Sequence, residues 1–444
     1  MQLFAGCISR VRLLGDLRPG EGRLVTWAFL YQFAIFSSYY VIRPIRDEAG
    51  VAGGVSNLSW LFTGTLVAMM AVNPVFAALV RLLPRPRFIA ISYRFFILNL
   101  LVFLVLFWVS SATAKIWTGR AFFIWTSVFN LFVVSVFWAF MVDIFTSEQG
   151  KRLFGMIAAA ATLGGIVGSA ITAGTVKSVG VPPLLIFAAS LLEVGVFAAG
   201  RLNRLAPVLQ IRTPGAQPKP AGDAPIGGRV LAGITHAWRS PYLLQISVYM
   251  LLFTVLSTFL YFQQAAIVGR SFADRTARTA FFARIDLMVN LLTLGAQFFL
   301  TGRVMKRAGV ALTLTFVPAL TAVGFLMVGF MPVAAIVVGF IVLRRAGNFA
   351  FAQPTREVLF TVLTREDKYK TKNFIDTVVY RLGDQVGAWA SALMTWAGLG
   401  TAIAWTAVPL ALAWVANAWR LGRRQEEKAC ALAERYPALE SKAV

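Results

Sequence analysis

Long apolar runs alternate with short polar segments along the whole chain. Twelve of the runs reach about 20 residues, the length that a helix needs to cross a bilayer. We expect membrane-spanning helices at 24–43, 58–83, 88–111, 121–146, 153–176, 180–203, 241–268, 279–302, 309–330, 332–353, 373–398 and 400–420. The pattern therefore predicts an all-α polytopic membrane protein with twelve transmembrane helices.

A polar, irregular segment separates the sixth run from the seventh. Residues 204–239 are rich in Pro, Gly and Ala, a composition typical of a flexible linker. The predicted domains are a tail at 1–23, a six-helix half at 24–203, the linker at 204–239, a second six-helix half at 240–420 and a tail at 421–444.

Charge is sparse along the chain and unevenly placed. Charged residues make up 14% of the sequence, whereas a soluble domain has about 25%. Of the 42 Lys and Arg, 29 lie in segments on one side of the predicted membrane and 8 in the opposite loops. This bias places both termini in the cytoplasm. The net charge of +23 is therefore a topology signal, and no nucleic-acid polymer is expected as a partner.

Residues that support catalysis or metal binding are scarce. Cys7 and Cys430 lie in the predicted cytoplasmic tails, so both are expected to be reduced. The single histidine, His236, lies in the linker. No phosphate-binding loop, dinucleotide motif or metal-ligand set is present. We expect no metal, no cofactor and no enzymatic activity.

Two basic turns occupy equivalent places in the predicted halves. ALVRLLPRPRF follows the second run and LTGRVMKRAGV follows the eighth. Six plus six helices with such turns resemble the major facilitator superfamily. That resemblance implies two related halves, a substrate site between them near the midplane, and alternating access.

The fifth run, FGMIAAAATLGGIVGSAITAG, is rich in small residues. Small residues let helix backbones approach closely. We therefore expect this helix to pack tightly on a neighbour, or alternatively to slide during a transport cycle.

Charged residues inside the runs are the main candidates for function. Each costs about 2.5–3.5 kcal/mol at the membrane centre, so it should face water or pair with another charge. These residues are Arg94, Glu193, Arg284, Asp286, Arg344, Arg345, Asp376, Arg381 and Asp384.

The eleventh run, KNFIDTVVYRLGDQVGAW, has the densest polar stripe. Arg381 and Asp384 are three residues apart and Tyr380 and Asp384 four apart, so they lie on neighbouring faces of a helix. Asp376 extends the stripe. The stripe is interpreted either as a substrate-contacting surface or as an ion-pair network that holds the helix in place.

The tenth run carries the adjacent Arg344 and Arg345. Adjacent helical residues point about 100° apart, so the two cannot both face one cavity. We expect one to bind a ligand and the other to pair or to reach the membrane surface.

The stretch FSSYYVIRPIRDEAG closes the first run. Pro44 predicts that the helix ends or kinks there. If a helical turn resumes, Arg43 and Asp47 are four apart and able to pair, and Arg46 lacks an intrahelical partner. A guanidinium suits carboxylate or phosphate, and Tyr40 adds a polar face. The stretch is either a substrate contact or gate, or a plain interfacial anchor.

Several segments resemble the ATP/ADP translocase family, the twelve-helix nucleotide transporters of plastids and intracellular bacteria. They are VIRPIRD, SVFWAF, FTSEQGKRLFG, SPYLLQI, QPTREVLF and KYKTKNFIDTVVYRLGD. The most specific piece is K-x-x-I-D-x-x-V at 372–379, which includes Lys372 and Asp376. The resemblance implies nucleotide exchange or proton-coupled nucleotide import.

The chain departs from that family at three places. The fourth and seventh runs carry no acidic residue in FIWTSVFNLFVVSVFW and LSTFLYFQQ. The position after Leu-Gly in the eleventh run, where the family has lysine, is Asp384. Such a charge reversal predicts a different anion preference.

These observations predict a secondary active transporter for an organic or phosphorylated anion, with ATP or ADP among the candidates. The expected substrate contacts are Tyr40, Arg43, Arg46, Arg284, Arg344, Arg345, Lys372, Tyr380 and Arg381. The expected ion-pairing or proton-coupling residues are Asp47, Glu193, Asp286, Asp376 and Asp384.

The alternative function is a non-transporting scaffold or sensor that retains the transporter fold. A third option, an exporter of hydrophobic cations, is disfavoured by the excess of arginine inside the runs. In either of the first two cases we expect a monomer in a bacterial inner membrane.

Overall fold

The computed structural model describes Arg18, residues 21–82, 85–211 and 240–363, Lys372 and residues 374–435. Within these residues the chain is helical, with short turns between helices. Cys7, His236 and most of the predicted linker lie outside the described residues. The predictions about them therefore stay predictions.

The helices follow the predicted runs closely. In the first half they are α2 (Glu21–Ala52), η2 (Val55–Asn57), α3 (Leu58–Leu82), α4 (Arg85–Val109), α5 (Ala112–Ile144), α6 (Ser147–Val179) and α7 (Val181–Ile211). In the second they are α9 (Pro241–Ser271), α10 (Arg275–Ala296), η3 (Gln297–Thr301), α11 (Gly302–Phe330), α12 (Ala334–Gly347), η4 (Asn348–Ala352), α13 (Gln353–Leu359), η5 (Ile375–Val379), α15 (Tyr380–Trp396), η6 (Gly400–Ala402) and α16 (Ile403–Arg435).

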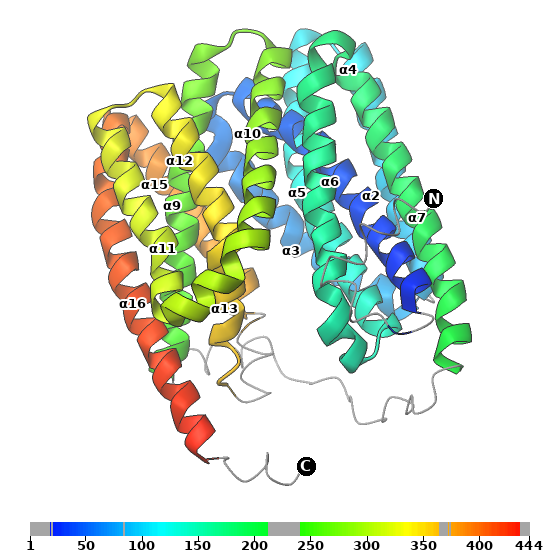
Figure 1. The fold of residues 1–444 in the computed structure, drawn as a ribbon. Coiled ribbons are helices and arrows are strands. Elements are labelled where there is room, and N and C mark those ends of the chain that lie inside the picture. The colour runs from blue at the N-terminus through cyan, green and yellow to red at the C-terminus, as the bar shows by residue number, and fades with distance from the viewer. Residues whose placement is uncertain are drawn as a thin grey trace. The chain divides into compact units, whose positions relative to one another are not determined.

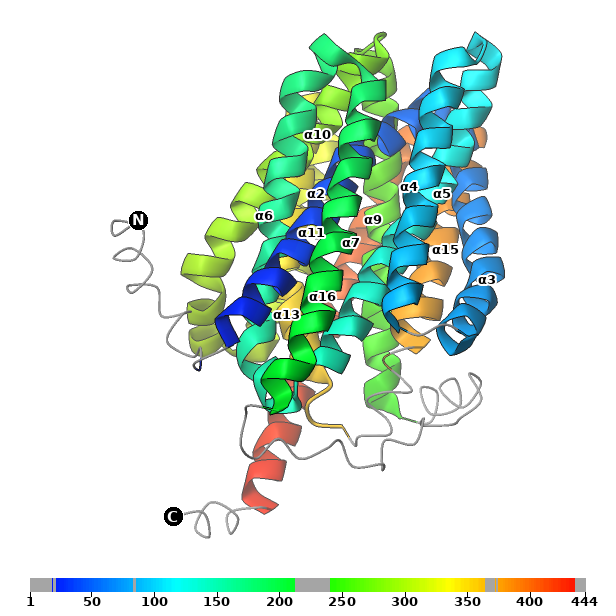
Figure 2. The same ribbon diagram turned by 90° about the vertical axis from the view of Figure 1, so that its right-hand side faces the viewer.

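Within each half of the chain, Figures 1 and 2 show these helices running up and down beside one another. Among the described residues, nine helical stretches are long and apolar enough to cross a membrane. The longest, Arg275–Phe330, contains both the eighth and the ninth predicted spans. The prediction of an all-α polytopic membrane protein is confirmed.

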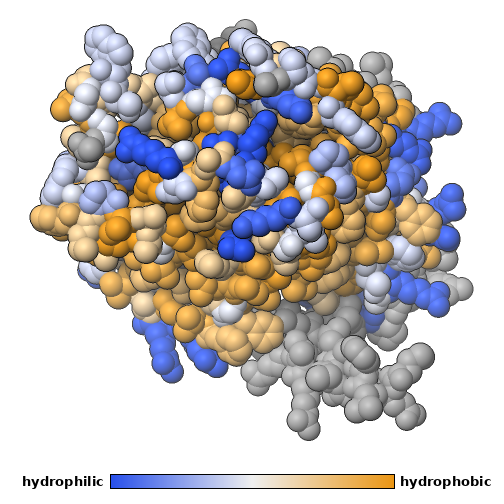
Figure 3. Space-filling view, turned by 90° about the horizontal axis from the view of Figure 1, so that it is seen from above, coloured by the Kyte–Doolittle hydropathy of each residue, from blue (hydrophilic) through white to orange (hydrophobic). Residues whose placement is uncertain are grey.

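The surface of the molecule supports the same conclusion. Figure 3 shows the molecule from above, where hydrophilic residues stand among hydrophobic ones at the ends of the helices. Large apolar side chains such as Met70, Phe95 and Trp108 are more than half exposed. Extended apolar surface of this kind is rare on soluble monomers, and a bilayer covers it.

The described residues group into two compact units. Unit 1 contains those of Met1–Gly54, Gly64–Pro220 and Ser271–Asn290. Unit 2 contains those of Val55–Thr63, Ala221–Arg270 and Leu291–Val444. The first turns of α10, which come late in the sequence, therefore belong to the same unit as α2.

In unit 1, α2 packs most extensively against α6 and α7. The contact with α6 depends on Gly164 and Gly168. A Cβ at Gly164 would lie 2.6 Å from the Phe33 carbonyl oxygen, and one at Gly168 would collide with that of Ser37. Only glycine allows such an approach, because the obstructing atoms are backbone. The close packing predicted for the fifth run is confirmed.

Unit 2 contains a matching contact between α15 and α9. A Cβ at Gly383 would collide with Thr254 Oγ1, and one at Gly387 would lie 2.8 Å from Thr258 Cβ. Each glycine pair is spaced four residues apart, so both members lie on one face of their helix.

The two contacts share a sequence motif. TLGGIVG at 162–168 and RLGDQVG at 381–387 both contain L-G-x-x-V-G. In each half, the motif lies on the fifth expected span and packs against the first. This repeat is stronger than that of the basic turns, although the two copies differ at two of the three positions between the glycines.

The path of α2 differs from the prediction at Pro44. The helix continues through this proline to Ala52, so of the two predicted alternatives, an end or a kink at Pro44, the end is wrong. Pro44 removes one backbone donor. Its neighbours Val41, Ile42 and Ile45 are buried in the core of unit 1, and this burial stabilises the turn. The charged residues after Tyr40 therefore lie on one continuous helix.

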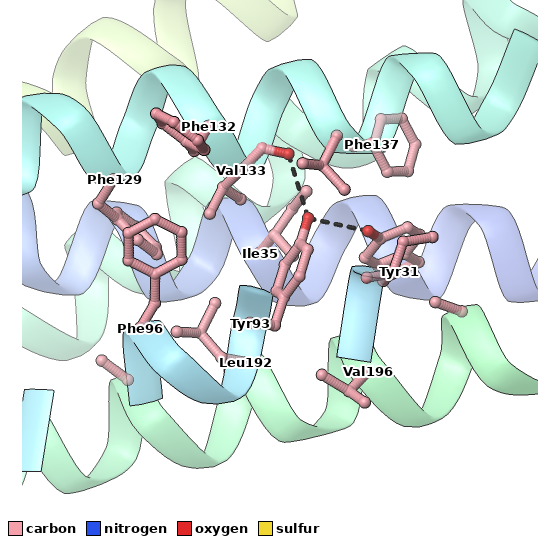
Figure 4. Close-up of a cluster of buried hydrophobic side chains, with 14 of the residues drawn as sticks. Tyr31, Ile35, Tyr93, Phe96, Phe129, Phe132, Val133, Phe137, Leu192 and Val196 are labelled. Atoms are coloured by element: carbon pink, nitrogen blue, oxygen red, sulfur yellow. Dashed lines mark hydrogen bonds between the residues drawn. The ribbon is translucent and has the colours of Figure 1, made fainter. Parts of the chain in front are cut away.

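A short polar chain crosses the core of unit 1 (Figure 4). The Tyr31 hydroxyl donates to the Tyr93 hydroxyl at 2.8 Å, which donates to the Val133 carbonyl at 3.1 Å. Both tyrosines are fully buried. The chain links α2, α4 and α5 and satisfies polar groups that burial would otherwise leave unpaired.

The glycine contact generates a stability prediction. We expect Gly168→Ala to lower the stability of the protein by about 1–3 kcal/mol, because overpacking forces backbones apart. Thermal unfolding of purified protein, monitored by fluorescence, measures the change. Gly174→Ala on the same helix is the control, because nothing lies within 4 Å of its added Cβ. An equal effect of both substitutions would contradict the close-packing interpretation.

Candidate functional site

The densest group of charges in unit 1 lies between the end of α2 and the start of α10. We call it the α2–α10 cluster. Its members are Arg43, Arg46, Asp47, Glu48, Arg275, Arg278 and Asp286.

Glu48 is the most heavily bonded acid of the α2–α10 cluster. Its carboxylate accepts hydrogen bonds from Arg275 Nε at 3.0 Å and Arg275 Nη2 at 3.1 Å. Arg278 Nη2 lies 3.3 Å from the same carboxylate. The Glu48 side chain is only 3% exposed, so these contacts compensate a buried charge. They fix the first turns of α10 to α2.

The two arginines of VIRPIRD each have an acidic partner. Arg43 Nη1 lies 3.2 Å from Asp286 Oδ1 on α10, and Arg46 Nη1 lies 3.1 Å from Asp47 Oδ1. The prediction that Arg46 lacks an intrahelical partner is therefore wrong. Its guanidinium also lies 4.0 Å from the centre of the Phe123 ring, a cation–π contact that stabilises it further.

Tyr40 stands beside this group. The Arg43 guanidinium lies 5.6 Å from the centre of its ring. Tyr40 is buried. The structure therefore brings together five of the predicted site residues: Tyr40, Arg43, Arg46, Asp47 and Asp286.

Three members of the cluster were missed from the sequence: Glu48, Arg275 and Arg278. Arginines in the first turn of a helix oppose the helix dipole and need a partner. Asp274, just before the helix, accepts a hydrogen bond from the Ala277 amide at 2.8 Å. Its hydrogen bonds, chiefly that from the Thr276 hydroxyl, hold the pKa of Asp274 below its ordinary value.

The sequence did contain a signal for these residues. The loop before α10 holds more basic residues than any other loop on the predicted non-cytoplasmic side. That excess runs against the positive-inside rule and indicates charges kept for another purpose.

The cluster holds four guanidinium groups and three carboxylates, so positive charge is in excess. An incoming carboxylate or phosphate would find fork-shaped donors already oriented. The carboxylates present now hold these donors in place.

In unit 2, the predicted stripe on α15 forms an ion pair. Arg381 Nη1 lies 3.1 Å from Asp384 Oδ2, a contact that their predicted place on neighbouring helix faces allows. The Thr258 hydroxyl of α9 donates to Asp384 Oδ1 at 3.5 Å, and the Arg381 guanidinium lies 5.5 Å from the Tyr380 ring centre. The group lies next to the Gly383 and Gly387 contact with α9.

Arg344 on α12 is almost fully buried, at 3% exposure. Its Nε donates to Thr321 Oγ1 at 3.0 Å, and its Nη2 donates to Ser257 Oγ at 2.8 Å and to the Phe253 carbonyl at 3.2 Å. No carboxylate of the described residues lies within ion-pair distance. Neutral oxygens therefore stabilise this cation, an arrangement that favours a structural role.

Arg345 differs from Arg344 in its surroundings, as their angular separation predicted. It is half-buried, whereas Arg344 is buried. It is the member of the pair better able to meet a ligand.

Lys372 and Asp376, from the K-x-x-I-D-x-x-V pattern, belong to a second group in unit 2. Lys372 pairs with Glu357, and Asp376 Oδ1 lies 4.0 Å from Arg356 Nη2. Two cations and two carboxylates balance here. Eight helical residues separate Asp376 from Asp384, a distance of about 12 Å along the axis.

Three π-helical turns interrupt the described helices of unit 2: η3, η4 and η5. η4 follows Arg345 after two residues, and η5 contains Asp376. Such turns often occur at functional sites. η3 and η4 also contact each other, because Thr301 Oγ1 donates to the Ala350 carbonyl at 2.9 Å. No sequence pattern signalled them.

The remaining predicted residues lie outside these groups. Arg94 and Glu193 pair at 2.8 Å on α4 and α7. Arg284 is exposed on the same face of α10 as the apolar Met288, four residues on. That face favours contact with lipid over contact with a polar substrate. Among the described residues no group of His, Cys, Asp and Glu is arranged to hold a metal ion.

No protein-family profile matches this sequence, and no curated protein is significantly similar to it. Solved structures are similar in fold. A bacterial homologue of the human lysosomal transporter Spinster, inward-facing and unoccupied, is 13% identical with a TM-score of 0.59, over 93% of this chain and 99% of that one.

Two further structures show the same similarity. The human organic anion transporter MFSD10 (TETRAN) is 16% identical with a TM-score of 0.56, over 90% of this chain and 100% of that one. A POT family transporter in complex with a thioalcohol-conjugated peptide is 10% identical with a TM-score of 0.63, over 92% and 100%. At these identities the similarity concerns the fold alone. This chain has the fold of major-facilitator-type transporters.

Proposed function

We propose that the chain is a secondary active transporter of an organic anion and works by alternating access. The α2–α10 cluster is the observation that carries this proposal. It gathers arginines with a fork-shaped donor geometry, holds them with carboxylates, and contains more positive than negative charge.

The cluster would work by exchange of ionic partners. In the structure, Arg46 pairs with Asp47 and Arg43 pairs with Asp286. A phosphate or carboxylate of the substrate would replace these acids as the hydrogen-bond acceptor of the two guanidinium groups. The substrate shifts the conformational equilibrium only as far as it prefers one state over the other. Released carboxylates gain affinity for a proton or another cation, which provides a route to coupling.

The contacts of Glu48 would serve as a gate on the non-cytoplasmic side. They join α2 to the first turns of α10, two segments far apart in the sequence. We infer that the Glu48 pairs must break when this end of the chain opens during transport.

The substrate class is the finer part of the proposal. The resemblance to ATP/ADP translocases supports a phosphorylated anion, and Arg46 matches the basic residue which that family has after its first helix. Asp384 stands where that family has lysine. This reversal of charge argues against ATP/ADP exchange and for a different anionic substrate. Arg345, Tyr380 and Arg381 would be further substrate contacts, with Asp384 as a counter-ion.

We further propose that the protein is a monomer in a bacterial inner membrane. Its termini would lie in the cytoplasm, and its two six-helix halves would span residues 24–203 and 240–420. The rival function is a scaffold or sensor that retains the fold. It predicts that no small anion changes the stability of the protein.

A ligand screen by thermal unfolding tests the substrate class. A ligand at 100 times its Kd stabilises the folded protein by about 2.7 kcal/mol, which raises Tm by several degrees. We expect a nucleotide or another phosphorylated anion to do so, and Arg46→Ala to abolish the shift.

Arg23→Ala is the matched control, because Arg23 is an exposed arginine on the same helix. It should keep the shift. A shift caused only by non-phosphorylated anions would support the proposed transporter but contradict a nucleotide or another phosphorylated anion as its substrate. No shift with any anion, in either the wild type or the variants, would favour the scaffold.

The Glu48 gate predicts a change in accessibility. Glu48→Gln weakens the contacts with Arg275 and Arg278 and should raise the population of the outward-open state at least tenfold, because removing one partner of a buried ion pair costs about 3–5 kcal/mol. In a variant whose only cysteine replaces the buried Thr279, labelling by an impermeant maleimide should accelerate by the same factor. Arg270→Gln is the control. An unchanged labelling rate in Glu48→Gln would exclude the gate.

A further inference from the structure

A second charged site lies on the outer face of unit 1, away from the α2–α10 cluster. α4 and α7 enclose a cleft of about 280 Å³. Arg94, Glu193, Arg201 and Arg204 contribute its charged lining, and Phe197 its largest ring. The proposed transport function uses none of these residues.

The lining residues of α7 share one helix face. Glu193, Phe197, Arg201 and Arg204 are spaced by four, four and three residues, which aligns them along the axis. The neighbouring face of α7, with Leu192 and Val196, points inward in Figure 4, and Val196 lies at the border where this face meets the cleft. The charged face is therefore turned away from the core of unit 1.

Positive charge exceeds negative charge in the cleft. Arg94 Nη2 bonds Glu193 Oε1 at 2.8 Å, and the two side chains are 62% and 49% exposed. Arg201 and Arg204 are also exposed. No carboxylate of the described residues pairs with either of them. The Arg201 guanidinium lies 5.0 Å from the Phe197 ring centre, which holds it over the cleft.

The charges are graded along the membrane normal. The sixth predicted membrane-spanning run ends at residue 203, so Arg201 and Arg204 are expected near the membrane surface. Glu193 is eight residues farther in, about 12 Å by helix geometry. Between these levels the lining is apolar, with Ile89, Phe140 and Val196. A ligand that fits needs an anionic head at the surface and an apolar chain along the floor.

We propose that this cleft binds the headgroup of an anionic phospholipid, in the leaflet that the charge distribution predicts to be cytoplasmic. The lipid phosphate pairs with the guanidinium groups of Arg201 and Arg204. One acyl chain lies along the apolar floor of the cleft, toward Arg94. Basic pockets between membrane helices on the cytoplasmic side bind such headgroups. A second copy of this chain is a poor occupant of the cleft, because the basic faces of the two copies would repel each other.

The test is native mass spectrometry of the full-length protein in detergent, titrated with phosphatidylglycerol or phosphatidylcholine. We expect phosphatidylglycerol to bind about tenfold more tightly, in line with the attraction of basic residues to anionic lipid. The double variant R201Q/R204Q should remove this preference. R423Q/R424Q removes two exposed arginines of α16 and should keep it.

A third variant separates the site from general attraction of lipid to a basic protein. Glu193→Gln removes the one carboxylate of the cleft and should strengthen phosphatidylglycerol binding about threefold. Equal losses in both double variants, or no preference for phosphatidylglycerol, would overturn the proposal. Displacement of the lipid by millimolar inorganic phosphate would also overturn it, because the site would then bind free anions.

Discussion

A guanidinium surrounded by apolar helices must be given partners, and this constraint organises the polar parts of the molecule. An unpaired buried charge costs several kcal/mol, about what one good ion pair with further hydrogen bonds returns. Arg43 and Arg46 have carboxylates within 3.2 Å. Arg344 instead has oxygens of Thr321, Ser257 and Phe253. These solutions differ in one respect that matters for transport: a paired carboxylate can be replaced by another anion, whereas a set of neutral oxygens offers nothing to exchange.

Close backbone contacts supply the rigid frame around these charges. In both halves of the sequence a G-x-x-x-G segment on the fifth expected span packs against the first, at Gly164 and Gly168 and again at Gly383 and Gly387. In the second copy the intervening Asp384 is a member of an ion pair. In the first copy the equivalent position is Gly165, which lies against Asn290 of α10. The same packing motif thus carries charge in one half and none in the other, so function and frame have diverged between the repeats.

The features that could be predicted from the sequence depend on local periodicity. Apolar length identified the helices, and the three-residue spacing placed Arg381 and Asp384 on neighbouring faces of one helix, where they form an ion pair. Contacts between distant segments could not be predicted in this way. The pairs of Glu48 with Arg275 and of Arg43 with Asp286 join residues more than 200 positions apart, and no spacing rule reaches that far. The helix does not end at Pro44, because burial of the neighbours of this proline outweighs one missing hydrogen bond. The π-helical turns left no pattern because their residues also suit an α-helix.

The exposure of the α2–α10 pairs indicates which partner can be exchanged. The Arg43 and Arg46 side chains are each 19% exposed, while the Asp286 and Asp47 side chains are 2% and 8% exposed. Water and solutes therefore reach the cations more readily than the acids. In the proposed function, an arriving anion would meet a guanidinium first and compete with a carboxylate that is held in the core behind it. Since the acid cannot leave, it would keep the site's charge nearly balanced when the anion departs. The site would then return to its starting pairs without a buried charge being left alone.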